Sequence, residues 1–251
     1  MMKIVVVGAS GMMGAKIVRT LERGGEDVVE ASSKLGVNAL SGEGLEAAFE
    51  GADVVIDVTN SGSFGEGDAL AFFKQAGKQM LSSAKAAGVR HYLALSVVGA
   101  DNLVENDYFR AKLVQENLVR ASGLAHTIVR STQFFEFFSG IVNTSVLDGN
   151  LRLPDLRLQP IAADEAATFM ANIATAEPRN SIVELGGPEP TELVELAREL
   201  LTVTEDNRPV AIDPASLYFG VSLARQGLLP NPGVVSGKLT FHDWLTRTVY
   251  G

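Results

Sequence analysis

The 251-residue chain contains no cysteine, which excludes a disulfide framework, thiolate catalysis and a cysteine-ligated zinc site. Histidine is nearly as scarce. His91, His126 and His242 are scattered without the spacing of metal ligands, so we expect no metal. No apolar run approaches the ~20 residues that cross a bilayer, and the run that ends at Val7 is too short for a signal peptide. We therefore expect no membrane partner and a cytoplasmic location.

Positive charge is also in short supply. The formal net charge is −9, and no stretch gathers lysine and arginine into the basic patch that nucleic-acid binding needs. Hydrophobic residues make up 46% of the chain, which suffices for a sizeable core. A small-molecule partner is therefore expected rather than a nucleic acid, and a homo-oligomer remains open.

Regular alternation of strand and helix patterns marks the first half of the chain. A β-branched run at residues 4–7 is typical of a strand buried on both faces. The alternation predicts an α/β fold of the doubly wound Rossmann type, with a parallel sheet covered by helices on both faces. Further strands are expected at 28–31, 53–58, 91–96 and 125–130, with a possible short one at 37–40, and helices at 14–23, 43–50, 68–87 and 106–121.

Beyond about residue 150 the rhythm loosens. Helices are expected at 164–175 and 192–201, with an extended segment at 181–185. The Pro- and Gly-rich segment 206–237 predicts surface loops with a short helix. We expect residues 1–150 to form a dinucleotide-binding core, and residues 151–251 to form a smaller substrate-side lobe packed on the same domain.

A glycine-rich loop connects the first strand to the first helix. Gly8 would permit the tight turn, Gly11 would let the backbone approach a pyrophosphate, and Gly14 would let helix and strand pack closely. The helix N-terminus favours an anion, and a serine hydroxyl can add to its free N–H groups. The expected pyrophosphate contacts are Gly8, Ser10, Gly11, Met12, Met13 and Gly14.

Four parts of the chain together resemble a known family. They are the G-x-x-G-x-x-G spacing, the strand end Asp53–Asn60, the segment 87–91 and the stretch from Tyr108 to Gln133. They are similar to the atypical short-chain dehydrogenase/reductase superfamily, in its NmrA-like NAD(P)H-binding branch. The resemblance thins after about residue 150. It implies that Thr59 and Asn60 line the cofactor beside the adenine or inner ribose, and that Gln133 lies near the nicotinamide.

The end of the second strand bears on the choice of dinucleotide. An NAD site usually places Asp or Glu at this strand tip, whereas here Ala31 is followed by Ser32, Ser33 and Lys34, and Glu30 lies within the strand. Ser33 and Lys34 would offer a hydroxyl and a cation to a 2′-phosphate, which favours NADP(H) over NAD(H). Lys34 could equally be an ordinary solvated lysine. Asp57, inside an apolar strand, is expected to be buried and structural.

Tyr108 and Lys112 lie four residues apart on one face of a predicted helix. The resemblance implies that Lys112 holds the nicotinamide ribose and lowers the tyrosine pKa, that Tyr108 passes a proton to or from the substrate oxygen, and that Ser96 steadies that oxygen. The same spacing also occurs on ordinary surface helices. Four phenylalanines, Phe134, Phe135, Phe137 and Phe138, follow Gln133 and suit a flat, apolar substrate, although aromatics at helical spacing also pack cores.

Three functions follow from these patterns. The first is an NAD(P)H-dependent oxidoreductase that transfers hydride from NADPH to a quinone or small carbonyl. The second is a non-catalytic NADP(H)-binding redox sensor or regulatory protein. The third is an enzyme resembling sugar-nucleotide epimerases. It is less favoured because the chain is short for that activity and lacks a basic cluster for a second pyrophosphate.

Overall fold

The computed structural model describes residues 1–61 and 67–250, and it divides into two compact units that interleave along the sequence. The first unit comprises Met1–Ser96, Asp107–Arg130 and Ala167–Val183. The second comprises Val97–Asn106, Ser131–Ala166 and Glu184–Gly251. The expected organisation, a core of residues 1–150 with a smaller lobe of residues 151–251 on the same domain, stays a prediction.

The central sheet is parallel and seven-stranded, with strand order β12-β9-β5-β4-β3-β1-β2. The doubly wound fold expected from the alternating pattern is confirmed. The chain adds strands in one direction from β1 to β2 and in the other direction from β3 onwards, so the topological switch point lies between β1 and β3. In such sheets, ligands bind beyond the carboxyl ends of the strands at this point. The sheet strands are β1 (Lys3–Val7), β2 (Asp27–Ala31), β3 (Val54–Asp57), β4 (His91–Val97), β5 (His126–Ser131), β9 (Ser181–Gly186) and β12 (Val235–Ser236).

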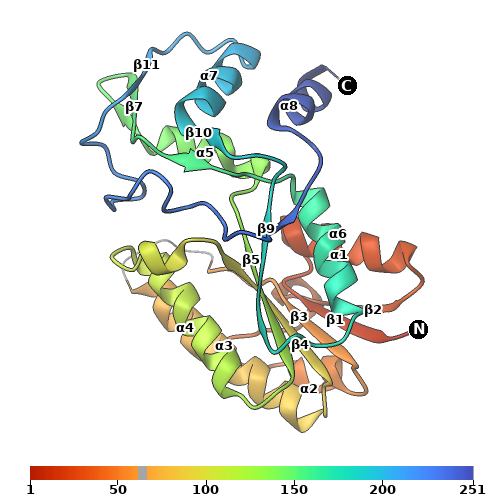
Figure 1. The fold of residues 1–251 in the computed structure, drawn as a ribbon. Coiled ribbons are helices and arrows are strands. Elements are labelled where there is room, and N and C mark those ends of the chain that lie inside the picture. The colour runs from red at the N-terminus through yellow and green to blue at the C-terminus, as the bar shows by residue number, and fades with distance from the viewer. Residues whose placement is uncertain (62–66, 251) are drawn as a thin grey trace. The chain divides into compact units, whose positions relative to one another are not determined.

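Helices cover both faces of the strands in the first unit. Figure 1 shows α3 (Asp68–Ala86) and α4 (Asp107–Ala121) side by side on one face of the sheet, with α1 (Met12–Arg23) on the other. Successive strand residues alternate between the two faces. Val5, Val7 and Val55 therefore join one buried cluster with residues of α3 and of α2 (Leu45–Phe49).

The second unit contains shorter elements. It includes two small sheets, one with strand order β10-β8 and the other with strand order β11-β7-β6. Helix α6 (Ala163–Ala174) and strand β9 each contribute residues to both units. The remaining elements of the second unit are η2 (Ala100–Asn102), η3 (Phe135–Phe137), α5 (Phe138–Asn143), β6 (Val146–Leu147), β7 (Asn150–Leu153), β8 (Arg157–Leu158), β10 (Thr191–Glu192), α7 (Leu193–Val203), β11 (Val210–Ile212) and α8 (Phe241–Tyr250).

Two local predictions were wrong. Residues 37–40 form no strand, because the Asn38 side-chain oxygen accepts from the backbone N–H groups of Leu40 and Ser41 and closes a turn instead. The segment 206–237 contains no helix among its described residues. Its prolines interrupt helical hydrogen bonding, and Val210–Ile212 pairs with β7 as a strand. In the described part of the chain, no helix is both long and apolar enough to span a membrane.

Candidate cofactor and reaction site

The loop between β1 and α1 (Gly8–Gly11) has the geometry of a phosphate cradle. Gly8 has a φ of 92°, and a Cβ there would lie 2.8 Å from the carbonyl oxygen of Val58. A Cβ on Gly14 would lie 2.2 Å from the carbonyl oxygen of Gly8, so only glycine fits this close helix–loop contact. Gly11 is the N-cap of α1, and no side chain caps this end of the helix. Its N-terminal N–H groups are therefore oriented for an anion.

Two neighbouring loops flank this cradle within the first unit. The backbone N–H groups of Gly8 and Ala9 donate to the carbonyl oxygen of Ala31 at the end of β2. This contact places Ser32 beside the loop, while Ser61 follows the end of β3. Both serines are buried, and neither hydroxyl has a hydrogen-bond partner in the described residues. Because buried hydroxyls are normally paired, these two indicate that a polar ligand belongs here.

The other expected cofactor residues of the first unit differ in exposure. Ser10, Ser33, Lys34 and Asn60 are exposed, with Ser33 and Lys34 on the short helix η1 (Ser33–Leu35). Thr59 is half-buried, and both its N–H and its hydroxyl donate to Asp57 Oδ1. Met12 is half-buried, and Met13 is buried under the first turn of α1.

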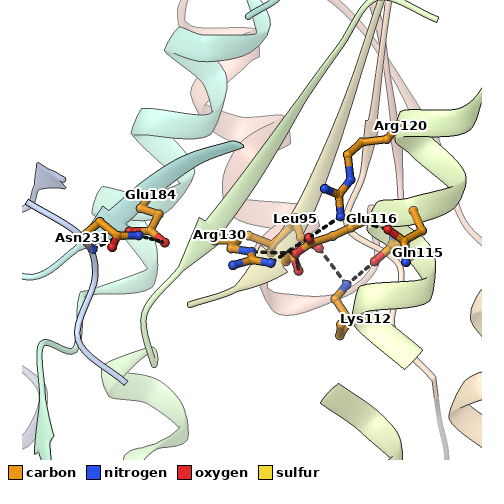
Figure 2. A network of polar contacts seen from close by, with 10 residues as sticks. Leu95, Lys112, Gln115, Glu116, Arg120, Arg130, Glu184 and Asn231 are labelled. Atoms are coloured by element: carbon orange, nitrogen blue, oxygen red, sulfur yellow. Dashed lines mark hydrogen bonds and ion pairs between the residues drawn. The ribbon is translucent and has the colours of Figure 1, made fainter. Parts of the chain in front are cut away.

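Lys112 is buried in the first unit, with 4% of its surface exposed. Its Nζ donates to the carbonyl oxygen of Leu95 over 2.7 Å and to Gln115 Oε1, as Figure 2 shows, and lies 4.5 Å from the centre of the Phe73 ring. An ammonium has three protons to donate, so one remains for a ligand. Burial lowers the pKa of Lys112 to about 8, although the negative charges of Asp57 and Glu116 oppose this.

Tyr108 lies one helical turn before Lys112 on α4, and its half-buried ring packs edge-on against Phe73 and Phe109. Burial raises the pKa of Tyr108 to about 12. This direction is opposite to the lowering that the family resemblance implies. At neutral pH the side chain is therefore a phenol, which can donate a proton but cannot act as a base.

The hydroxyl of Ser96 donates to Glu116 Oε1 over 2.6 Å. Glu116 also accepts two hydrogen bonds from the Arg130 guanidinium, at 2.8 and 2.9 Å (Figure 2). The structure thus joins Ser96 to a buried ion pair between α4 and β5. Its expected contact with a substrate oxygen stays a prediction.

In the second unit, Gln133 lies two residues beyond the end of β5 and is buried. Neither atom of its amide forms a hydrogen bond of good geometry in the described residues. Burial raises the pKa of the nearby Tyr218 phenol, and the Gln133 amide opposes this in part. The four phenylalanines that follow divide by environment. Phe135 and Phe138 are buried against Phe241, as ordinary core residues.

Phe134 and Phe137 remain open to a ligand. Phe134 is half-buried and Phe137 is 54% exposed, and their ring centres lie 6.1 Å apart. The core interpretation therefore holds for Phe135 and Phe138, and contact of Phe134 and Phe137 with a flat, apolar substrate stays a prediction.

Sequence analysis missed several polar partners of the site. Asp57 is buried as expected, and its carboxylate accepts from Gln115 and Tyr92 as well as from Thr59. Gln115 carried no motif, because its partner is 58 residues away in the sequence. Arg130 did carry a signal, since a charged residue in a strand expected to be buried needs a buried partner.

The residues of the first unit fit a dinucleotide. The cradle has no room for side chains at Gly8 and Gly14, its helix end is uncapped, and two buried hydroxyls lack partners. The Gly8–Gly14 loop would hold the pyrophosphate, and the β2 and β3 ends would hold the adenosine half. Lys112 would offer its remaining N–H to a ribose hydroxyl.

Comparison with known proteins agrees with this fit. A family model described as NAD(P)H-binding matches residues 8–176. Divinyl chlorophyllide a 8-vinyl-reductase of Arabidopsis thaliana is 26% identical over 271 residues, covering 92% of this chain and 65% of the relative. A (4-alkanoyl-5-oxo-2,5-dihydrofuran-3-yl)methyl phosphate reductase of Streptomyces griseus is 26% identical over 250 residues, covering 90% of this chain and 80% of the relative.

The chain spans 50% to 65% of the length of three of its curated relatives. Among solved structures, the NADPH-dependent quinone oxidoreductase of Escherichia coli, complexed with NADPH, has a TM-score of 0.75 at 17% identity, covering 98% of this chain and 99% of that one. At that identity the likeness shows the fold. The family match places the protein. The chain belongs to the NAD(P)H-binding family.

Proposed function

We propose that this protein is an NADPH-dependent reductase that transfers hydride to a quinone or a small conjugated carbonyl compound. The observation that carries the proposal is the pairing on α4 of a protonated phenol, Tyr108, with a buried ammonium, Lys112, one helical turn later. Among the relatives, two enzymes are named as reductases and one neighbouring structure is a quinone oxidoreductase. These names support a reductive reaction on a conjugated acceptor.

Each residue has a distinct part in the proposed reaction. Bound NADPH would supply a hydride to the acceptor carbon. Tyr108 would donate its phenolic proton to the acceptor oxygen, and solvent would return that proton afterwards. The Lys112 ammonium would stabilise the tyrosinate left behind, and would hold the ribose through its remaining N–H. The overall balance is NADPH, one proton and the acceptor giving NADP⁺ and the reduced acceptor.

The preference for NADP(H) rests on the end of β2. The strand ends at Ala31 without a carboxylate at its tip, and exposed Ser33 and Lys34 follow on η1. A hydroxyl and a cation at this place suit a 2′-phosphate, whereas a carboxylate would repel it.

A non-catalytic sensor is the second candidate, and one observation favours it. The Ser96 hydroxyl is bonded to Glu116, so the arrangement gives no ready third group to steady a substrate oxygen. Such a protein would bind NADP(H) through the same loop and report its redox state to a partner.

The experiment that separates the two is NADPH oxidation against a panel of quinones and aromatic aldehydes, run with the wild type and Tyr108→Phe. The variant keeps the ring packing and loses only the hydroxyl. A rate that falls about 10²-fold or more, with NADPH binding unchanged, supports the reductase and its proton donor. An equal rate in both proteins rejects Tyr108 as the donor. Tight NADPH binding without turnover of any acceptor favours the sensor.

A further inference from the structure

A neutral amide separates two opposite charges in the interior of the first unit. The Lys112 ammonium donates to Gln115 Oε1, and Gln115 Nε2 donates to Asp57 Oδ2 over 2.7 Å. The three side chains are 4%, 2% and 1% exposed, respectively. Since both ends of the amide are engaged, Gln115 has one orientation here, with its oxygen towards the cation and its nitrogen towards the anion.

Without this spacer the two charges would meet directly. A buried ammonium and carboxylate attract strongly at low dielectric, and a direct pair would draw Lys112 towards Asp57. With the spacer, Lys112 stays on the carbonyl oxygen of Leu95 and keeps one N–H for a ligand. Asp57 is left to organise the end of β3, where its other oxygen holds both the N–H and the hydroxyl of Thr59.

We propose that Gln115 is a positioning residue, which holds the Lys112 ammonium apart from the Asp57 carboxylate and so sets the direction and the charge with which Lys112 meets the cofactor. This proposal rests on the proposed function in placing Lys112 against NADPH. Gln115 also joins Lys112 to the Thr59 loop through Asp57. It therefore connects the two parts of the site that the ribose and the adenosine half would contact.

The charge on Lys112 depends on several elements around it. The ring of Phe73 from α3 and the carbonyl oxygen of Leu95 from β4 face its Nζ without titrating. Burial lowers the pKa of Lys112, and the Asp57 and Glu116 carboxylates raise it by a smaller amount. Glu116 is itself paired with Arg130. With a pKa of about 8, Lys112 loses its proton in mildly alkaline solution. NADPH affinity should therefore weaken as pH rises through this range.

Two substitutions of Gln115 should move that pH dependence in opposite directions. Gln115→Met removes the acceptor for the ammonium, so Lys112 loses its proton at lower pH. Gln115→Glu puts a carboxylate at the same place, so Lys112 keeps its proton to higher pH. Gln115→Met loses the hydrogen bond to Asp57 outright. In Gln115→Glu the bond survives only where the new side chain keeps its proton, because an ionised carboxylate cannot donate. The expected shifts are about one pH unit each way.

The measurement is the NADPH dissociation constant as a function of pH, with thermal unfolding recorded to show that each variant folds. Gln75→Met, an exposed glutamine on α3, is the matched control, and Lys112→Met identifies which midpoint belongs to the lysine. Opposite shifts in the two Gln115 variants support the proposal. A wild type with no midpoint near pH 8, or shifts in the same direction, overturn it, because a merely structural role would weaken both variants alike.

Failure of the reductase proposal would be visible separately. If the midpoints shift as expected while no acceptor is reduced, the protein is not a reductase of these compounds, and the role of Gln115 stands. If the wild type does not bind NADPH at all, the placing of Lys112 and the role of Gln115 both fall.

Discussion

Glu116 and Arg130 form an ion pair inside the first unit, and Glu116→Leu tests how firmly it holds α4 to β5. Only 1% of the Glu116 side chain is exposed, and it accepts two short bonds from Arg130 and one from Ser96. Removing one partner leaves a buried guanidinium without its counter-charge, which costs about 3–5 kcal/mol in comparable cases. For a chain of this size that corresponds to a fall in melting temperature of about 6–20 °C.

The assay is urea unfolding followed by circular dichroism, with three companion variants: Arg130→Met, the double variant Glu116→Leu/Arg130→Met, and Arg120→Ala. The double variant Glu116→Leu/Arg130→Met should be more stable than Glu116→Leu alone, since an apolar pair replaces the ion pair without leaving a charge behind. Arg120→Ala is the control, because this half-exposed arginine lies 3.7 Å from Glu116 and should contribute less than about 1 kcal/mol. A Glu116→Leu protein within about 1 kcal/mol of the wild type, or a double variant that loses the sum of the two single losses, would refute the reasoning.

Three further predictions concern the cofactor site. Gly14→Ala should abolish NADPH binding and lower the free energy of unfolding by about 1–3 kcal/mol, because its Cβ would meet the Gly8 carbonyl oxygen at 2.2 Å. Gly140→Ala is the control and should be tolerated, because its Cβ would have no atom within 4 Å. Lys34→Ala should weaken NADPH binding about tenfold in titrations and leave NADH binding unchanged. Lys34→Arg should retain the preference for NADPH. Equal losses for both nucleotides would reject the 2′-phosphate assignment. Lys112 has its pKa lowered from 10.5 to about 8, so the unfolded chain binds more protons between these pH values and stability from this group rises with pH across the window. Unfolding titrations should show that Lys112→Met lacks this rise, and an identical pH profile in the variant would contradict the burial of the ammonium.

Periodicity and glycine spacing were sufficient to predict most of the core. A buried strand followed by G-x-x-G-x-x-G and an amphipathic helix admits few folds, and β1, α1 and the loop between them lie where expected. The predictions that failed involve weaker local signals. Residues 37–40 are apolar enough for a strand, yet one side-chain oxygen, that of Asn38, diverts their N–H groups into a turn. Residues 206–237 were expected to include a short helix, but Val210–Ile212 instead pairs with β7.

The candidate site was predictable in part. Residues that act through the backbone or through local spacing, such as Gly8, Gly14 and the Tyr108–Lys112 pair, carry their signal within a few positions. Ser96 was singled out by its distance from Tyr108, and the direction of its hydroxyl towards Glu116 could not be read from that distance. The phenylalanine segment likewise contained both a core pair and an open pair, and burial alone distinguishes them.

The sequence by itself determined the alternation of elements, the phosphate loop and the helix that carries Tyr108 and Lys112, because backbone geometry and hydrophobic periodicity are local properties. Only the tertiary structure decided the electrostatics of the site. Asp57 on β3 meets Gln115 and Lys112 on α4 across 58 residues of sequence. Ser96 on β4, Glu116 on α4 and Arg130 on β5 are likewise brought together only by the fold. A pKa depends on burial and on charges within a few ångströms, whatever their distance in sequence. The lowered pKa of Lys112 and the raised pKa of Tyr108 are therefore properties of the folded chain.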